Sequence, residues 1–306
     1  MRRRRLYKAR MHVLLSGASG FLGSACVDLL KRFPEIELSV VRASRVDCVL
    51  PLGSRELPLE DVSDFTALNK LVGSRPPTHI IHVAALSSPA ACEQQPELAW
   101  HANVAFTESL SRLAREHKAH MLLASTDLVF DGSEPVPGGF REQDEPEPLS
   151  VYSRSKREAE LVALELERGC VARLALLYGH SHSSSRGVLG WMEDALRARE
   201  ELTLFSDEFR SPVHVADAAR SLLSLSNVGA TGIWNCGGPE RLSRLEFGHM
   251  VAETLGYETA SIRQASRADV PSLPPRPKDV CLNSEKLIDL LGEPCRTVRQ
   301  ALLSEQ

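Results

Sequence analysis

Hydrophobic residues come in short runs through the first half of the chain, and amphipathic stretches separate these runs. The runs are nearly continuous, as in Met121–Ala124, which is typical of strands buried on both faces. A strand followed by a helix, repeated along the chain, predicts an α/β fold with a doubly wound parallel sheet. We expect strands at Met11–Ser16, Glu37–Arg42, His79–Ala84, His120–Ser125 and Cys170–Leu177, and helices at Phe21–Arg32, Phe65–Gly73, Pro96–Glu116 and Val151–Glu167.

The second half has a less regular pattern. Helices are expected at Val213–Leu225, Ser243–Leu255 and Ser284–Leu291, with Gly292 ending the last, and a strand at Gly232–Cys236. The segment Val270–Pro277 holds four prolines and is expected to be extended. We therefore expect a smaller C-terminal α/β lobe within 181–306, with some segments returning to the first sheet.

Charge and cysteine usage exclude several classes of protein. A net charge of −4 argues against a nucleic-acid partner, and no apolar run approaches the ~18 residues of a membrane span. Seven scattered cysteines without a CxxC pair argue against disulfides and zinc and favour a cytoplasmic location. Residues 1–10 hold five Arg and one Lys. We expect a disordered leader there, and a targeting or phosphate-binding arm is left open.

A glycine motif follows the first expected strand and opens the first expected helix. It reads Gly17-Ala18-Ser19-Gly20-Phe21-Leu22-Gly23. Gly17 permits a tight turn, Gly20 lets the backbone approach a pyrophosphate, and Gly23 allows close packing of helix on strand. The helix N-terminus adds N–H groups and a partial positive charge. Residues 11–180 are therefore expected to form a dinucleotide-binding domain, with Ser19, Phe21 and Leu22 also against the dinucleotide.

The end of the second expected strand bears on the choice of dinucleotide. Arg42 and Arg45 lie there, and no acid stands where one would bind the adenosine ribose. An arginine there can neutralise a 2′-phosphate, so we expect NADP(H) to be preferred, while NAD(H) remains open. Solvated arginines on a loop are the alternative interpretation. Asp61 is expected either to touch the adenine side of the site or to cap the next helix.

The sequence Tyr152-Ser153-Arg154-Ser155-Lys156 places a phenol and an amine on one face of an expected helix. We expect the lysine cation to lower the pKa of the Tyr152 phenol and so to favour acid–base catalysis. Lys156 is also expected to hold the nicotinamide ribose. A surface Tyr–Lys pair is the alternative.

Small hydroxyl side chains stand at the end of the strand expected at His120–Ser125. Ligands bind at the carboxyl ends of strands in open parallel sheets. We expect Thr126 or Ser125 to donate a hydrogen bond to a substrate carbonyl. A simple turn or helix cap is the alternative for Ser125-Thr126-Asp127.

Taken together, these motifs resemble those of the extended short-chain dehydrogenase/reductases, and most of all the dTDP-4-dehydrorhamnose reductase branch. Few of the matching segments are selective singly, but their order and spacing are. They are Gly17–Gly23, His82-Val83-Ala84-Ala85, Asn103 to Thr107, Ser125-Thr126-Asp127-x-Val129-Phe130-Asp131-Gly132, Tyr152-x-x-x-Lys156, Arg173 with Tyr178-Gly179, and Arg276-Pro277-x-Asp279-Val280 to Leu287.

The resemblance implies a Rossmann-type domain, a C-terminal substrate lobe and an oxidoreductase that acts on a CH–OH group or its ketone. The catalytic set would be Thr126, Tyr152 and Lys156, and the reaction the reduction of a 4-keto group on a nucleotide-linked 6-deoxysugar. Ala84, Ala85 and Asn103 would contribute to the dinucleotide site. The expected substrate residues are Ser87, Ser125, Thr126, Asp127, Leu128, Leu176, Arg210 and Arg276.

Two positions depart from the reductase pattern. Leu128 stands where the branch usually has Tyr, and Leu176 where it tends to have Trp. Three functions therefore stay open: a sugar-nucleotide 4-ketoreductase, an epimerase or dehydratase that retains its cofactor, and a non-catalytic subunit like the dinucleotide-binding regulatory subunit of methionine adenosyltransferase. A metal is not expected, and a homodimer is left open.

Overall fold

The computed structural model describes residues 11–43, 49–182, 187–270 and 276–305. The Arg-rich leader, Arg45, Cys48 and most of the proline-rich segment lie outside these ranges. No helix in the described ranges has the length and apolar character needed to cross a membrane. The six cysteines in these ranges are all free and buried.

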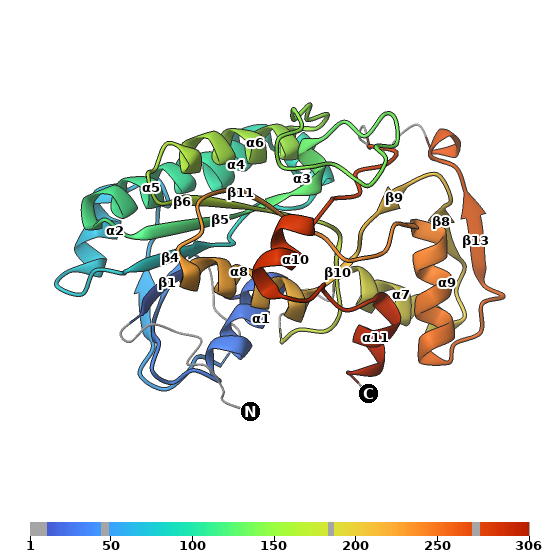
Figure 1. Ribbon diagram of the computed structural model, residues 1–306, viewed down its shortest axis with the longest axis horizontal. Helices are drawn as coiled ribbons and strands as arrows, with labels where there is room; N and C mark the ends of the chain where they lie inside the picture. The colour runs from blue at the N-terminus through green and yellow to red at the C-terminus, as the bar shows by residue number, and fades with distance from the viewer. Residues whose placement is uncertain (1–10, 44–48, 183–186, 271–275, 306) are drawn as a thin grey trace.

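Within the described part of the chain, seven strands form one parallel sheet with the order β11-β6-β5-β4-β1-β2-β3 (Figure 1). This confirms the predicted doubly wound α/β fold. The chain moves outward from β1 to β3, then restarts at β4 on the other side of β1, so the switch point lies between β1 and β4. The strands are β1 (His12–Ser16), β2 (Glu37–Arg42), β3 (Arg55–Pro58), β4 (His79–His82), β5 (His120–Thr126), β6 (Gly169–Leu174) and β11 (Gly232–Cys236).

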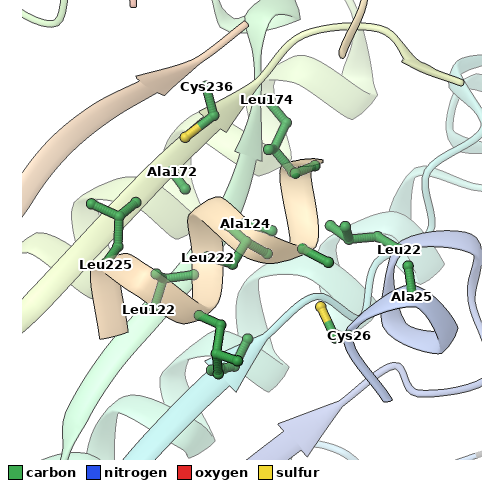
Figure 2. Close-up of a cluster of buried hydrophobic side chains, with 14 of the residues drawn as sticks. Leu22, Ala25, Cys26, Leu122, Ala124, Ala172, Leu174, Leu222, Leu225 and Cys236 are labelled. Atoms are coloured by element: carbon green, nitrogen blue, oxygen red, sulfur yellow. The ribbon is translucent and has the colours of Figure 1, made fainter. Parts of the chain in front are cut away.

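Helices cover both faces of this sheet (Figure 1). On one face lie α1 (Phe21–Leu30), α8 (Val215–Val228) and α10 (Glu285–Leu291), and on the other α2 (Phe65–Val72), α5 (Phe106–His117) and α6 (Val151–Leu164). Alternation along β1 divides the core, because Leu15 packs with the α1–α8 side and Leu14 with the α2–α5 side. Figure 2 shows α1, the strands and α8 meeting through Leu22, Leu122 and Leu222 among others.

The long helix predicted at Pro96–Glu116 is interrupted in the structure. It consists of α4 (Pro96–Trp100), the π-helical turn η1 (His101–Ala105) and α5. A π turn adds one residue to the helical repeat, which 3.6-residue periodicity cannot reveal. The short helix α3 (Pro89–Gln94), which has one buried residue, was not predicted. Edge strand β3 was also missed, because Leu57 is its only fully buried side chain.

Two other predicted elements are divided. The Cys170–Leu177 strand becomes β6 and the two-residue β7 (Leu177–Tyr178), which pairs with β10 (Val213–His214). The Val213–Leu225 helix begins only after β10, since His214 caps α8. Gly292 ends α10 with φ 78°, as predicted.

The remaining elements build a smaller lobe at one end of the sheet (Figure 1). Its core contains Leu189, Met192, Leu204, Phe247 and Val251. The sequence pattern did not reveal α7, β8, β13 or α11, and the domain boundary near residue 180 stays a prediction. The elements are α7 (Gly187–Ala198), β8 (Leu202–Phe205), β9 (Phe209–Arg210), β12 (Leu242–Ser243), α9 (Arg244–Leu255), β13 (Ile262–Ala265) and α11 (Val298–Leu303), with the 3₁₀ turn η3 (Arg267–Asp269). A further 3₁₀ turn, η2 (Asp127–Val129), directly follows β5 and packs in the core of the large sheet.

Candidate active site

The glycine motif forms the turn between β1 and α1. Gly17 has φ +80°, and a Cβ there would lie 2.6 Å from the Ala84 nitrogen. A Cβ at Gly23 would collide with the Gly17 carbonyl, so α1 can approach β1 only with glycine at this position. Gly20 is the N-cap of α1, and the first turn carries neither an acidic residue nor a capping side chain. The turn therefore leaves a helix N-terminus suited to an anion.

A cavity of about 590 Å³ runs along the carboxyl ends of the central strands, beside this turn. It brings together most of the side chains predicted for the dinucleotide and the reaction. The predicted residues that line it are Gly17, Ser19, Gly20, Phe21, Leu22, Gly23, Ala84, Ala85, Ser87, Ser125, Thr126, Asp127, Leu128, Tyr152, Lys156 and Leu176.

Tyr152 and Lys156 lie one turn apart on α6, and they are 9% and 2% exposed. Burial raises the pKa of Tyr152, the Asp127 charge raises it further, and a hydrogen bond with Thr126 only partly opposes them. The net pKa of Tyr152 is therefore raised by burial, and the predicted net lowering is wrong. Burial also lowers the pKa of Lys156, to about 8, against the nearby Glu160 charge.

The two hydroxyls at the end of β5 have different surroundings. Ser125 Oγ donates to Glu160 Oε1 at 2.6 Å, so its proton is already engaged. Thr126 Oγ1 donates to Asp127 Oδ1 at 3.1 Å and accepts from the Leu128 N–H at 3.2 Å. The Thr126 proton is also engaged, but its hydrogen bond is longer and its partner Asp127 lines the cavity, whereas Glu160 does not. The geometry therefore favours Thr126 for contact with a substrate carbonyl and Ser125 as a structural support.

Asp127 lies between the dinucleotide cavity and a second one. Burial raises the pKa of its carboxyl to about 6, although Arg210 and the Thr126 hydroxyl oppose this shift. Asp127 Oδ2 is buried without a hydrogen-bond partner among the described residues, and it lies 4.0 Å from Arg210 Nε. This carboxyl is therefore available to a ligand.

Asn103 does not line the cavity, although the sequence placed it in the dinucleotide site. Its amide accepts from the Leu86 N–H at 2.8 Å and donates to the Leu86 carbonyl at 3.2 Å and to Ser155 Oγ at 2.9 Å. These bonds tie the π turn η1 to the segment after β4 and to α6. The structure thus gives Asn103 a supporting position behind the site.

His82, which belongs to one of the matching segments but was given no role from the sequence, is buried behind the cavity. Its Nδ1 lies 2.6 Å from Ser16 Oγ, and its Nε2 lies 3.1 Å from Thr107 Oγ1. Burial and the Lys156 charge lower its pKa to about 3, so the imidazole is neutral. Its pairing with Ser16 joins β4 to β1 at the switch point.

Arg42 lies at the end of β2, beside a small cavity that Gly17, Ser19 and Ala84 also line. Its Nε is 3.3 Å from Glu56 Oε2, and both side chains are about half exposed. The structure therefore places Arg42 next to the glycine turn but gives it a competing acidic partner on β3. Arg45 lies outside the described residues.

Asp61 is exposed and lines neither of these cavities. Its carboxylate accepts hydrogen bonds from the Ser63 N–H and hydroxyl at 2.9 and 2.7 Å and pairs with His101 at 3.2 Å. The alternative prediction, that it caps the next helix, is wrong, because Asp64 caps α2.

A second cavity, of about 260 Å³, adjoins the first and shares Pro89, Asp127, Leu128 and Leu176 with it. The predicted Arg210 and Arg276 line it. No signal in the sequence indicated its other lining residues, because they come from separate loops and helix ends. These are Ser88, Ala90, Leu149, Ser150, Ser153, Glu208, Arg244 and Pro277.

Three arginines meet around the buried Glu208 carboxylate in this second cavity. Arg276 donates to both of its oxygens, at 2.8 and 2.9 Å, and Arg210 Nη2 lies 3.2 Å away. Burial raises the pKa of Glu208, but the arginines outweigh it and the net pKa is lowered. Burial lowers the pKa of Arg244 to about 10, and its Nη1 has no partner within the described structure. Three guanidinium groups against two carboxylates make this cavity suited to an anionic ligand.

A wider groove of about 820 Å³ lies elsewhere, between α1, α8 and the segment 293–300. Several of its charged side chains are already paired, as Arg296 is with Asp217 at 2.9 Å and Arg220 with Glu293. It contains none of the predicted site residues, so we place the functional site at the two adjoining cavities. Among the described residues, no group of three or more His, Cys, Asp or Glu side chains is arranged to hold a metal.

Known proteins resemble this chain over almost its whole length. It is 26% identical over 285 residues to the probable low-salt glycan biosynthesis reductase Agl14 of Haloferax volcanii, covering 92% of this chain and 93% of that protein. It is 28% identical over 281 residues to methionine adenosyltransferase 2 subunit beta of Xenopus laevis, covering 90% and 80%. It is 28% identical over 292 residues to a dTDP-4-dehydrorhamnose reductase of Aggregatibacter actinomycetemcomitans, covering 92% and 93%.

A solved structure supports the same fold. The dTDP-4-dehydrorhamnose reductase of Bacillus anthracis in complex with NADP superimposes with a TM-score of 0.82 at 21% identity, covering 96% of this chain and 98% of that one. The resemblance to the dTDP-4-dehydrorhamnose reductase branch is thereby confirmed. A sequence model of the family described as the RmlD substrate binding domain matches residues 11–304, and the chain therefore belongs to that family.

Proposed function

We propose that the protein reduces the 4-keto group of a nucleotide-linked 6-deoxysugar, with NADPH as the preferred hydride donor. One observation carries the proposal: Thr126, Tyr152 and Lys156 line one cavity with the glycine turn, and this cavity meets an arginine-lined one at Asp127, Leu128 and Leu176. The reductases among the relatives support an oxidoreductase.

The residues present fit a nicotinamide dinucleotide. Gly17 and Gly23 occupy positions where any side chain would collide with backbone, and the N-terminus of α1 carries no competing carboxylate in its first turn. Such a turn accommodates a pyrophosphate. The cavity continues from this turn to Tyr152 and Lys156, which supports a dinucleotide that extends from the turn toward the proposed catalytic set. Solved relatives include complexes with NADP and with NAD.

When bound, a reduced nicotinamide supplies the hydride for the ketone carbon. The Tyr152 hydroxyl donates a proton to the ketone oxygen, and the Thr126 hydroxyl donates a hydrogen bond to the same oxygen. Burial keeps Tyr152 protonated at neutral pH, so the proton is present to be donated. Lys156 is largely protonated below its pKa of about 8 and favours the negative charge that develops on Tyr152.

The second cavity is suited to bind an anionic group of the substrate. Arg210, Arg244 and Arg276 converge there, and Arg244 still has a buried N–H group to offer. A nucleotide diphosphate carries the charge that this excess of guanidinium groups would bind. The sugar ring would then lie where the two cavities join, next to Thr126 and Tyr152.

We expect Arg42→Ala to lower the affinity for NADPH by about tenfold or more, because a charge-assisted bond to the 2′-phosphate contributes roughly 1.5–3 kcal/mol. Exposure and the Glu56 pairing place the effect at the lower end of this range. NADH affinity should stay within about twofold. Calorimetric titration of both dinucleotides checks this, with Arg75→Ala as the control, since exposed Arg75 pairs with Glu37 at 3.4 Å. Equal or tighter binding of NADH by the unsubstituted protein contradicts the assignment.

Substrate preference should follow from Leu128 and Leu176. Both line the join between the cavities, and neither supplies a hydrogen-bond donor. Trp191 is half exposed and lines neither cavity, so it does not restore an aromatic ring there. A join without a phenol or indole donor selects weakly for a sugar hydroxyl. We therefore expect weak activity on dTDP-4-dehydrorhamnose and better activity on a bulkier or less hydroxylated 4-keto relative. The alternative is that Ser87 and Ser88, which line the first and the second cavity, restore the usual preference.

The measurement is kcat/KM for dTDP-4-dehydrorhamnose beside deoxygenated and branched 4-keto analogues. Leu128→Tyr should move the preference back toward the more hydroxylated sugar. A preference of the unsubstituted protein for dTDP-4-dehydrorhamnose by more than about tenfold, or ~1.4 kcal/mol, would count against the role of the two leucines.

The overall test is a screen of nucleotide-linked 4-keto sugars that follows the loss of NADPH absorbance. Stoichiometric NADPH consumption with one of these substrates supports a reductase. Conversion of a nucleotide sugar without net consumption supports the epimerase or dehydratase alternative.

A non-catalytic regulatory role is the second candidate, because relatives named methionine adenosyltransferase 2 subunit beta align over 90% of the chain. Stable co-purification with a methionine adenosyltransferase, unchanged by Tyr152→Phe, favours that role. The buried Thr126, Tyr152 and Lys156 set favours the enzyme.

A further inference from the structure

Glu160 joins three polar residues behind the catalytic set. It lies on α6 one turn after Lys156, and its side chain is 0% exposed. Arg173 on β6, which is also 0% exposed, donates to both carboxylate oxygens at 3.0 and 2.9 Å. Ser125 donates to the same carboxylate at 2.6 Å, and Arg157 Nη1 lies 3.1 Å from it on the outer side.

A buried carboxylate held in this way does more than pair with one arginine. Arg173 alone would satisfy its charge, yet Ser125 takes the shortest of its hydrogen bonds. Ser125 directly precedes Thr126, so the hydrogen bond from Ser125 to Glu160 fixes the carboxyl end of β5 against α6. Positions 156 and 160 lie one turn apart on the same face of α6, and the Glu160 charge favours the protonated form of the Lys156 amine.

We propose that Glu160 is a positioning residue for the reaction, which acts through two neighbours: it fixes Ser125 next to Thr126, and it supplies the negative charge that faces Lys156. The inference rests on the proposed function, because it assigns Lys156 to dinucleotide binding. Glu160 itself does not line the cavity.

The charged and titratable groups around Lys156 make this role testable. Tyr152 lies on its own helix, and His82 of β4, which is neutral, faces it from the sheet. Asp127 lies beyond Tyr152, and Arg173 and Arg157 flank the Glu160 carboxylate. Glu160 is the neighbour whose charge favours the protonated amine, and burial opposes it. Neutralising Glu160 should therefore make Lys156 lose its proton at a lower pH.

The experiment measures NADPH affinity by fluorescence titration between pH 6 and pH 9, with no sugar substrate present. In the unsubstituted protein, we expect affinity to fall as the pH rises through about 8, where Lys156 loses its proton. In Glu160→Gln, the fall should occur about one pH unit lower, which reduces affinity roughly threefold near pH 7.5, approaches tenfold near pH 9 and stays below about twofold at pH 6. Glu160→Asp keeps the charge and should restore most of the profile.

Three further variants complete the test. Glu158→Gln is the matched control, since Glu158 is exposed on the same helix, and its profile should superimpose on that of the unsubstituted protein. Ser125→Ala should lower kcat without displacing the profile. Glu160→Gln leaves Arg173 without its buried partner. If the single variant does not fold, the double variant Glu160→Gln with Arg173→Met removes both charges and should show a displacement in the same direction, but a smaller one, because loss of the Arg173 cation offsets part of it.

Two results would overturn the proposal. If the variants that remove Glu160 lose affinity equally at pH 6 and pH 8, or show an unchanged profile, Glu160 has only a structural role. If the unsubstituted protein binds no NADPH at any pH, the proposed function itself fails, and the role of Glu160 fails with it.

Discussion

Tyr152→Phe is expected to lower kcat by about 10²- to 10⁴-fold while NADPH affinity changes little. The substitution keeps the buried ring and removes only the hydroxyl that donates the proton. Steady-state kinetics on the best substrate of the screen, together with NADPH titration, provides the measurement. Because burial raises the pKa of Tyr152, the fall of activity at high pH should follow Lys156, near pH 8, rather than ionisation of the phenol.

Tyr178→Phe is the matched control for this substitution. Tyr178 is fully buried, lines neither cavity, and its hydroxyl has no hydrogen-bond partner among the described residues. Its variant should keep kcat within about twofold. Retention of most activity by Tyr152→Phe would remove Tyr152 from the role of proton donor.

Glu208→Ala should lower the free energy of unfolding by about 3–5 kcal/mol, because it leaves buried guanidinium groups without their shared anion. Arg276 would lose both of its bonds to Glu208, and Arg210 its contact at 3.2 Å. Glu208→Gln keeps an acceptor and should destabilise the protein less. Urea denaturation at pH 7 measures both effects.

The pH dependence gives this prediction a second readout. The pKa of Glu208 is lower in the folded protein than its ordinary value of 4.5, so its stabilising effect is complete above that value and is lost as the pH falls through the folded-state pKa. The unsubstituted protein should therefore exceed Glu208→Ala in free energy of unfolding by the largest amount near neutral pH. This difference should become smaller at acid pH.

Glu258→Ala is the control, because Glu258 is an exposed partner of Arg199 at 3.8 Å. Such pairs contribute at most about 1 kcal/mol. A destabilisation by Glu208→Ala as small as that of Glu258→Ala would show that the arginines find other partners.

Local patterns in the sequence predicted the sheet well, because a parallel strand that is buried on both faces must be apolar along its whole length. β1, β2 and β5 therefore lie where they were expected, to within about a residue. The partly buried edge strand β11 also lies where it was expected. Motifs that depend on spacing over a few residues were predicted equally well. The glycine turn needs no partner from elsewhere to be recognised, and Tyr152 and Lys156 share a helix face because they are four residues apart.

The elements that were missed have weak or irregular patterns. The edge strand β3 has one buried residue, and the turn η1 departs from the ordinary helical repeat. Because of that turn, Asn103 serves Leu86 and Ser155 rather than the cavity. Where the sequence leaves two roles open for a residue, its neighbours in the folded protein decide between them.

The sequence by itself determined the fold class and the glycine turn and indicated the proposed catalytic set, since these depend on composition and spacing over a few residues. Only the tertiary structure decided the electrostatics. Glu208 meets Arg276 across 68 positions of the chain, and Ser125 meets Glu160 across 35. Burial raises the pKa of Tyr152, where local spacing alone predicted the opposite. The physical reason is that desolvation and charge pairing depend on which distant segments fold against one another, and no local pattern records that.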